Sequence, residues 1–299
     1  MEHNSFVSGF GSIVVDVLMS SPDLELYRKN SVLGQTLQIG GVIPTALMVL
    51  SRLGISTQFH STVGDDLFGH ALRTMLAKEH IDTQNVITVK NKTPFAFVVV
   101  NPANGKRTSF YTTGTFSTNV HSFDVSLNPK STHLLLDGHN SAISLTLLKK
   151  AKKQRIVTLL DLGNPKDGID TLVPYADYII VPQAYWKIVW PHKSPEKVAA
   201  NLLDEGPSTV VLTMEERGCL ITQKHATFHQ PSIAVKAMDT NGAGDVFFGS
   251  FVYGLTQGWD LRKTAQFACA AAARSCTIVG KDQKIPHSTQ EVFDFLARI

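Results

Sequence analysis

The 299-residue sequence has little cysteine and little charge of either sign. Its three cysteines form no C-x-x-C pair, and an odd number in so long a chain favours reduced thiols in a cytoplasmic protein. Charged residues make up 18% of the chain, with 28 Lys and Arg against 25 Asp and Glu, so the basic stripe typical of nucleic-acid-binding proteins is not expected. No run of about 18 apolar residues occurs, which argues against a membrane span. The expected partners are therefore small molecules rather than nucleic acid or membrane.

Several familiar catalytic motifs are also missing. The sequence contains no G-x-x-x-x-G-K-[ST], no G-x-S-x-G and no H-E-x-x-H, which excludes a P-loop, a nucleophile elbow and a zincin-type metal site. The Gly9-Phe-Gly11 segment lacks the third glycine of a dinucleotide-binding motif. The eleven histidines show no metal-ligand spacing. Any chemistry must therefore come from other patterns.

Short apolar runs alternate with stretches of helical length in the second half of the chain. The runs at 132–136, 155–160, 178–181 and 209–213 have the composition of strands buried in a parallel sheet. The intervening stretches include 145–153 and 195–203, which have the polar and apolar pattern of helices. Repeated strand-helix units predict an α/β fold with a doubly wound, mostly parallel sheet flanked by helices.

A different pattern occupies residues 92–113. Two β-prone segments, 95–100 and 107–112, flank a turn rich in Asn, Pro and Gly, which predicts a hairpin. Short β-prone runs at 14–17 and 36–39 are placed to pair with it. Because no linker or repeat separates these parts, we expect a single domain over residues 1–299. The segments at about 14–39 and 92–113 would then form a small antiparallel β lid.

Residues 239–245, Asp-Thr-Asn-Gly-Ala-Gly-Asp, carry the strongest chemical signal. They precede an apolar stretch of helical periodicity that Gly258 would end. Small residues at 242–244 let several backbone N–H groups point outward at the positive end of that helix, which predicts an anion site. Asp245 in the first turn is placed to act as a general base, although a simple helix-capping role would explain an aspartate there equally well.

Paired glycines at 40 and 41 form a second notable segment. They precede a helix in which Pro44 is expected at the first position and which Gly54 would end. A glycine pair allows a ligand to approach the backbone closely, whereas a tight turn without a ligand is the alternative.

Taken together, these segments resemble the ribokinase-like (PfkB) carbohydrate kinases along nearly the whole chain. Residues 40–54 resemble the family's first signature, and 63–69 (Val-Gly-Asp-Asp-Leu-Phe-Gly) with 81–83 resemble the block that follows. Residues 239–245 resemble the second signature. Gly280, the Ile-Pro pair at 285–286 and the last helix at 290–298 resemble the family's ending. All four blocks occur in the family's order.

The resemblance implies a ribokinase-like fold that transfers the γ-phosphoryl group of ATP to a sugar hydroxyl. It makes Asp245 the base and gives the anion hole to the backbone of Gly242, Ala243 and Gly244. The lid would exclude water from the closed site. The residues that would bind the sugar are Asp16, Gly40, Gly41, Thr45 and Arg107, and those that would bind ATP are Gln183, Thr213, Gly218 and Cys269.

The resemblance also implies bound ions, and the chain departs from the family pattern at several positions. Mg²⁺ is expected with ATP, and a monovalent cation, K⁺, is expected near Asp239 and Asn241. The family's Asn-x-x-Glu is absent near Gln183, and Glu215 stands where the nucleotide loop usually has glycine. Thr45 replaces the usual asparagine of the first signature. A solvated hairpin tip is the alternative role for Arg107.

The favoured function is an ATP-dependent sugar kinase. The Gly-Gly-x-x-x-Thr-Ala-Leu pattern at 40–47 looks closest to kinases of ketohexoses, including sulfonated fructose, while ribose and 2-keto-3-deoxygluconate remain alternatives. A nucleoside or vitamin-type kinase on the same fold, or a binding or regulatory relative without turnover, is the runner-up. Aromatic residues in the lid predict a homodimer formed through it.

Overall fold

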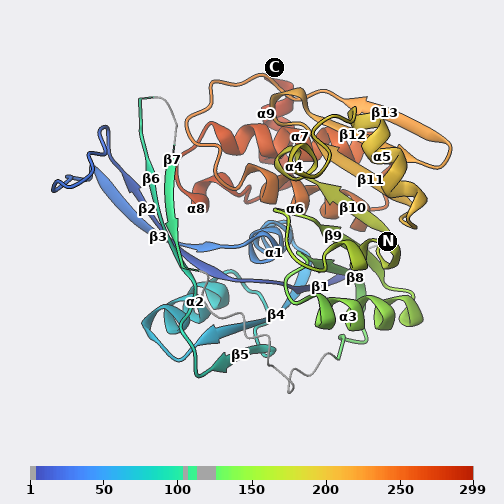
Figure 1. The fold of residues 1–299 in the computed structure, drawn as a ribbon, viewed down its shortest axis with the longest axis horizontal. Coiled ribbons are helices and arrows are strands. Elements are labelled where there is room, and N and C mark those ends of the chain that lie inside the picture. Colours follow the sequence, from blue (N-terminus) through green and yellow to red (C-terminus); the bar gives the residue numbers. More distant parts are fainter. Residues whose placement is uncertain (1–4, 104–106, 113–125, 299) are drawn as a thin grey trace.

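The computed structural model describes residues 5–103, 107–112 and 126–298, and its centre is a nine-stranded sheet in the order β13-β12-β11-β10-β9-β8-β1-β4-β5 (Figure 1). Its strands pair in parallel from β11 to β5, while the β11–β12 and β12–β13 pairs are antiparallel. The strands are β1 (Phe6–Phe10), β4 (Ser56–Gly64), β5 (Val86–Val89), β8 (Ser131–Leu136), β9 (Val157–Asp161), β10 (Tyr178–Val181), β11 (Thr209–Thr213), β12 (Cys219–Gln223) and β13 (Ala226–Gln230).

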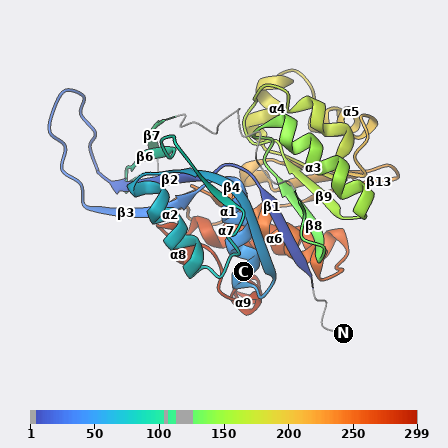
Figure 2. The same cartoon turned by 90° about the horizontal axis from the view of Figure 1, so that it is seen from below.

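Helices cover both faces of this sheet (Figure 2). One hydrophobic core lies under α1 (Val42–Arg52), α2 (Leu67–Lys78), α6 (Ala243–Thr256), α7 (Leu261–Cys276) and α9 (Thr289–Ala297). The other lies under α3 (Ser141–Gln154), α4 (Gln183–Val189), α5 (Pro195–Asp204) and the 3₁₀ helix Asp170–Tyr175. Because both faces are packed against helices, β10 and β11 near the middle of the sheet are largely apolar.

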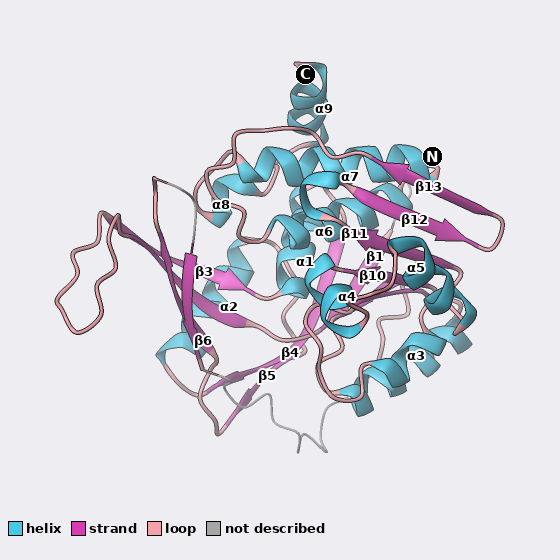
Figure 3. Ribbon diagram, turned by 45° about the horizontal axis from the view of Figure 1, so that its top comes forward, coloured by secondary structure: helices cyan, strands magenta, loops and turns pink. Residues whose placement is uncertain are grey.

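A second, four-stranded sheet projects from the main body (Figures 1 and 3). It consists of β2 (Val14–Ser20), β3 (Gly34–Gly40), β6 (Phe95–Val100) and β7 (Arg107–Tyr111), in the order β3-β2-β6-β7. Its outer pairs are antiparallel, while the central pair, β2 with β6, runs parallel. The mostly parallel sheet flanked by helices and the small separate sheet are as the sequence predicts, while the parallel pairing of β2 with β6 differs from the antiparallel lid that was expected.

Helix ends follow local chemistry. The side chains of Asp66, Ser194 and Asp260 accept hydrogen bonds from backbone N–H groups at the starts of α2, α5 and α7. Gly54 and Gly258 adopt left-handed backbone angles just beyond α1 and α6, where the sequence predicts the stops. One detail differs, because α1 begins at Val42 and places Pro44 at its third residue rather than its first.

Candidate active site

The start of α6 forms an open anion cradle. Gly242 caps the helix with a φ of 77°, a conformation that favours glycine, and no side chain caps the first turn. A Cβ added to Gly244 would meet no atom within 4 Å, so space for a ligand lies directly above this turn. The first N–H groups of a helix lack partners within it and carry its positive dipole end. The backbone of Gly242, Ala243 and Gly244 therefore lies open to an anion, with the Ala243 N–H also donating to the Thr240 carbonyl at 3.3 Å.

Asp245 lies in this first turn, and its surroundings tune its proton affinity. Burial raises the pKa of Asp245 to about 6, and the charge of Asp16 adds to the rise. The charges of Lys281 and Arg107 oppose the rise. A carboxyl with such a pKa is mostly ionised at neutral pH and still accepts a proton readily, as a general base must.

Lys281 is the buried cation beside this carboxyl. It lies in the short helix α8 (Lys281–Lys284), and its ammonium donates to the Ile39 carbonyl at 2.6 Å and to the Thr45 hydroxyl at 2.9 Å. Its charge lowers the pKa of both Asp16 and Asp245. Lys281 was not among the predicted site residues, although the two lysines between Gly280 and the Ile-Pro pair were a readable signal.

The residues predicted to bind the sugar lie on β2, at the end of β3 and at the start of α1. A Cβ at Gly40 would lie 2.5 Å from an oxygen of Asp16, so the carboxylate lies directly over Gly40 and any side chain there would displace it. Burial raises the pKa of Asp16, and Lys281 and Arg107 counteract this. Gly41 has a φ of 109°, and its carbonyl accepts the Thr45 hydroxyl at 2.7 Å. Asp16, Gly40, Gly41 and Thr45 are thus brought together.

Arg107 joins this group from the lid. It begins β7, its guanidinium donates to the Asn241 side chain, and its charge acts on both Asp16 and Asp245. This placement over the site favours the ligand-contacting interpretation of Arg107 over a solvated hairpin tip.

Two further carboxylates lie at the ends of β8 and β9. Burial raises the pKa of Asp161 to about 7, and the charge of Asp245 raises it further. Burial alone would also raise the pKa of Asp137, but the charges of His139 and Lys166 and the hydrogen bonds of His139 lower it to about 2. The sequence analysis missed these groups, although both aspartates follow predicted parallel strands, whose carboxyl ends typically form ligand sites.

Two of the predicted nucleotide residues lie at the turn between β11 and β12. Thr213 ends β11, and Gly218 has a φ of 89° in the turn before β12. A Cβ there would clash with the Gln230 carbonyl at 2.1 Å, so this glycine is required. Glu215 in the same turn is exposed and has a φ of 54°, the left-handed region in which glycine is favoured.

Gln183 and Cys269 have protein partners. The side-chain amide oxygen of Gln183 accepts a hydrogen bond from the Arg217 guanidinium at 2.9 Å. The Cys269 thiol lies 3.9 Å from that of Cys219 and is buried in the core. The roles of both residues toward ATP stay predictions.

The loop that precedes the cradle does not present an open cation site. The carboxylate of Asp239 forms a buried ion pair with Lys284, whose ammonium also bonds the carbonyls of Asp239 and Asn241. The Asn241 side chain is taken by Arg107. Where the resemblance implied K⁺, the chain has its own ammonium group.

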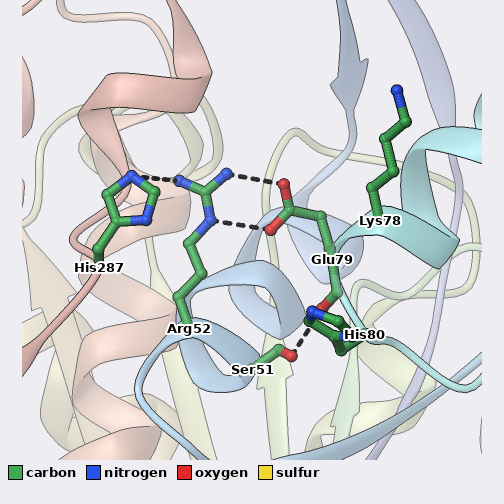
Figure 4. A pocket seen from close by; sticks show the side chains of 6 residues that line it. All are labelled: Ser51, Arg52, Lys78, Glu79, His80 and His287. Carbon is green, nitrogen blue, oxygen red and sulfur yellow. Dashed lines mark hydrogen bonds and ion pairs between the residues drawn. The ribbon is translucent and has the colours of Figure 1, made fainter.

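A small surface pocket of about 240 Å³ lies away from these residues, beside the end of α1 (Figure 4). Arg52 crosses it and forms a bidentate ion pair with Glu79, with N–O distances of 2.7 and 2.8 Å. The guanidinium also reaches Asp282, which links α1 to the segment that carries Lys281 and Lys284. Arg52 is thus used in holding that segment.

Known proteins share this architecture over nearly the whole chain. Ribokinase from Haemophilus influenzae is 28% identical over 301 residues, covering 96% of each chain, and ketohexokinase from Mus musculus is 21% identical, covering 90% of this chain and 94% of its own. The crystal structure of ribokinase from Thermotoga maritima superposes with a TM-score of 0.83 at 25% identity, covering 98% of this chain and 99% of its own. An Escherichia coli protein described as a ribokinase II, solved with ATP and Mg²⁺, superposes with a TM-score of 0.86 at 22% identity, covering 99% and 100%.

The family assignment rests on a match to a family model in addition to these individual proteins. Residues 5–287 match the model of the pfkB family carbohydrate kinases, which spans the lid, the glycine pair, the cradle and α8. The chain belongs to the pfkB family and is an ATP-dependent carbohydrate kinase.

Proposed function

We propose that Asp245 is the general base that activates the acceptor hydroxyl of a free sugar. Its carboxylate stands in the first turn of α6, beside the cradle where the phosphoryl group would sit. As the hydroxyl oxygen bonds to the γ-phosphorus of ATP, the bond from that phosphorus to the β–γ bridging oxygen breaks and ADP leaves. The proton of the hydroxyl passes to Asp245, and negative charge spreads over the phosphoryl oxygens during the transfer. The N–H groups of Gly242, Ala243 and Gly244 meet that charge. The shared position of base and cradle is the observation that carries the proposal.

The sugar would lie between the lid and the start of α1. The Asp16 carboxylate would accept hydrogen bonds from sugar hydroxyls, and the backbone of Gly40 and Gly41 lies beside it without side chains in the way. Arg107 reaches the cradle loop from the lid. Closure over the sugar would therefore bring a cation toward the reacting groups and exclude water.

ATP would lie on the β11–β12 side of α6, with Thr213 and Gly218 beside it. Mg²⁺, when bound with ATP, neutralises phosphate charge during transfer. Among the described residues no group of three His, Cys, Asp or Glu side chains is arranged to hold a metal. This favours a Mg²⁺ ion that enters on the nucleotide phosphates, which is the usual mode for this ion, with Asp161 as the carboxylate on the protein side.

The acceptor we favour is a free pentose or ketohexose. Ribokinases are prominent among the relatives, so the ketohexose preference read from residues 40–47 is widened to include ribose. The positive charges of Lys281 and Arg107 counteract the Asp16 carboxylate at this position, which suits a neutral sugar.

The test is ADP production from Mg-ATP with ribose, fructose, tagatose, sulfofructose, fructose phosphates, 2-keto-3-deoxygluconate and adenosine. We expect strong turnover with ribose or one of the free ketohexoses, and weaker turnover with the phosphorylated sugars. Preferential turnover of adenosine would contradict the sugar assignment. Silence across the panel, with ATP binding intact by calorimetry, would favour a binding protein without turnover.

Location and assembly also remain proposals. No helix among the described residues is long and apolar enough to cross a membrane. We propose a cytoplasmic enzyme that pairs through the lid, whose β2–β3 loop and β7 strand expose large apolar side chains.

A further inference from the structure

The ammonium group of Lys284 is surrounded by oxygens of the loop before the cradle. Its Nζ lies 2.6 Å from Oδ2 of Asp239, 2.7 Å from the Asp239 carbonyl and 2.9 Å from the Asn241 carbonyl. The residue is 2% exposed. One carboxylate and two carbonyl oxygens thus converge on one buried positive charge.

This set of oxygens is suited to a monovalent cation. Protein sites for K⁺ are built from carbonyl oxygens that replace the hydration shell of the ion. An ammonium group is close to K⁺ in size, but its three N–H donors need three acceptors. The two carbonyls and the carboxylate provide one acceptor for each donor, so the hydrogen-bonding capacity of Lys284 is filled. A free cation at this place would meet both an occupied site and a like charge.

The backbone that carries Lys284 is held from two sides. The Arg274 guanidinium donates to the Lys284 carbonyl at 3.2 Å and pairs with Glu291 at 2.7 Å. Arg52 donates to the carbonyl and the carboxylate of Asp282, two residues before Lys284. The ammonium is therefore presented from a fixed segment rather than from a solvated side chain.

The loop that Lys284 binds leads directly into the anion cradle. The other carboxylate oxygen of Asp239 accepts the Asn241 N–H at 2.9 Å, which closes a turn just before Gly242. The ion pair with Lys284 therefore fixes both the Asp239 carboxylate and the turn that sets the direction of the cradle's N–H groups.

We propose that Lys284 is a tethered replacement for a free monovalent cation, and that this kinase therefore works without K⁺. Lys284 is a positioning residue, because it acts on the reaction through the loop rather than by touching the sugar or ATP. A covalently attached cation occupies its site at any salt concentration, whereas a free ion must bind and lose translational freedom. The activity readout rests on the proposed kinase function, while the stability readout does not.

The experiment compares the wild type with Lys284→Ala and Lys284→Ser in buffers of equal ionic strength that contain KCl, NH₄Cl or choline chloride. Between KCl and choline chloride, we expect wild-type turnover to change by less than about twofold and the wild-type Tm by less than about 2 °C. In choline both variants should lose about tenfold or more of turnover, and KCl or NH₄Cl should restore much of it. Their Tm should rise with KCl concentration beyond any rise in choline.

The matched control is Lys224→Ala, which removes an exposed ammonium from the β12–β13 turn and should leave the cation response unchanged. Stimulation of the wild type by K⁺ of more than about fivefold over choline would overturn the proposal. The proposal would also be overturned if the variants fold but their Tm and turnover do not change with KCl. If both variants fold only when KCl or NH₄Cl is present, the proposal is supported. If neither variant folds in any of the three salts, the comparison of wild-type turnover in KCl and in choline chloride decides.

Discussion

At the scale of single residues, the site is governed by charges held close together out of water. Asp245 and Asp161 have pKa values raised to about 6 and about 7, first by burial and then by neighbouring carboxylates. The positive charge of Lys281 partly offsets the rise in the pKa of Asp245. Such a balance suits proton transfer near neutral pH, because the base is ionised but not strongly stabilised as an anion.

This balance predicts the pH dependence. Because the base must be deprotonated, kcat/KM should fall with decreasing pH around a midpoint near pH 6. Lys281→Met removes a positive charge that favours the carboxylate, so its midpoint should move to higher pH by about one unit, equivalent to about 1.4 kcal/mol. The pH–rate profiles of the wild type, Lys281→Met and the surface control Lys224→Met would check this. A midpoint that moves downward or stays fixed in Lys281→Met would contradict the proposed electrostatics.

At the scale of elements, the turn between β11 and β12 carries a strained residue. Glu215 has a φ of 54°, which costs an L-residue about 1–2 kcal/mol, and its side chain is exposed. Glu215→Gly should therefore raise the free energy of unfolding by about 1 kcal/mol, after allowance for the chain entropy of glycine. Removing a carboxylate from the proposed phosphate side should also lower the KM for ATP.

Urea denaturation tests this with a neighbour as the control. Glu216 is exposed in the same 3₁₀ helix but has no positive φ, so Glu216→Gly should destabilise the protein by about 0.5–1 kcal/mol. If Glu215→Gly proves no more stable than Glu216→Gly, the strain argument is wrong.

The elements were largely predictable because their patterns are local. The β10 and β11 strands have the bounds that their apolar runs predict, and the cradle follows from three small residues before an apolar helix. The parallel pairing of β2 with β6 was not predictable, because it joins strands about 80 residues apart. Lys281 and Lys284 were missed for a similar reason, since only tertiary folding shows that their stems are buried and their ammonium groups meet the site.

At the scale of the whole molecule, the lid predicts the assembly. Leu26 and Tyr27 in the β2–β3 loop are 71% and 103% exposed, and Tyr111 on the edge strand β7 is 74% exposed. A second copy that covers this surface would bury apolar area that otherwise faces water. Light scattering should therefore show a dimer for the wild type and a monomer for Leu26→Asp combined with Tyr111→Asp.

The control for assembly changes an exposed apolar residue elsewhere. Ile188 in α4 is 66% exposed, far from the lid in the sequence, and Ile188→Asp should leave the dimer intact. A wild type that is monomeric at micromolar concentration, or a lid variant that stays dimeric, would count against pairing through the lid.

The central claim is that Asp245 is the base in sugar phosphorylation, and turnover by Asp245→Asn tests it most directly. With the best sugar of the panel, kcat should fall by about 10³-fold or more, while calorimetry should show ATP binding little changed. Circular dichroism and Tm serve to show that the variant is folded. A folded variant that keeps more than about a tenth of wild-type kcat would contradict the catalytic role of Asp245.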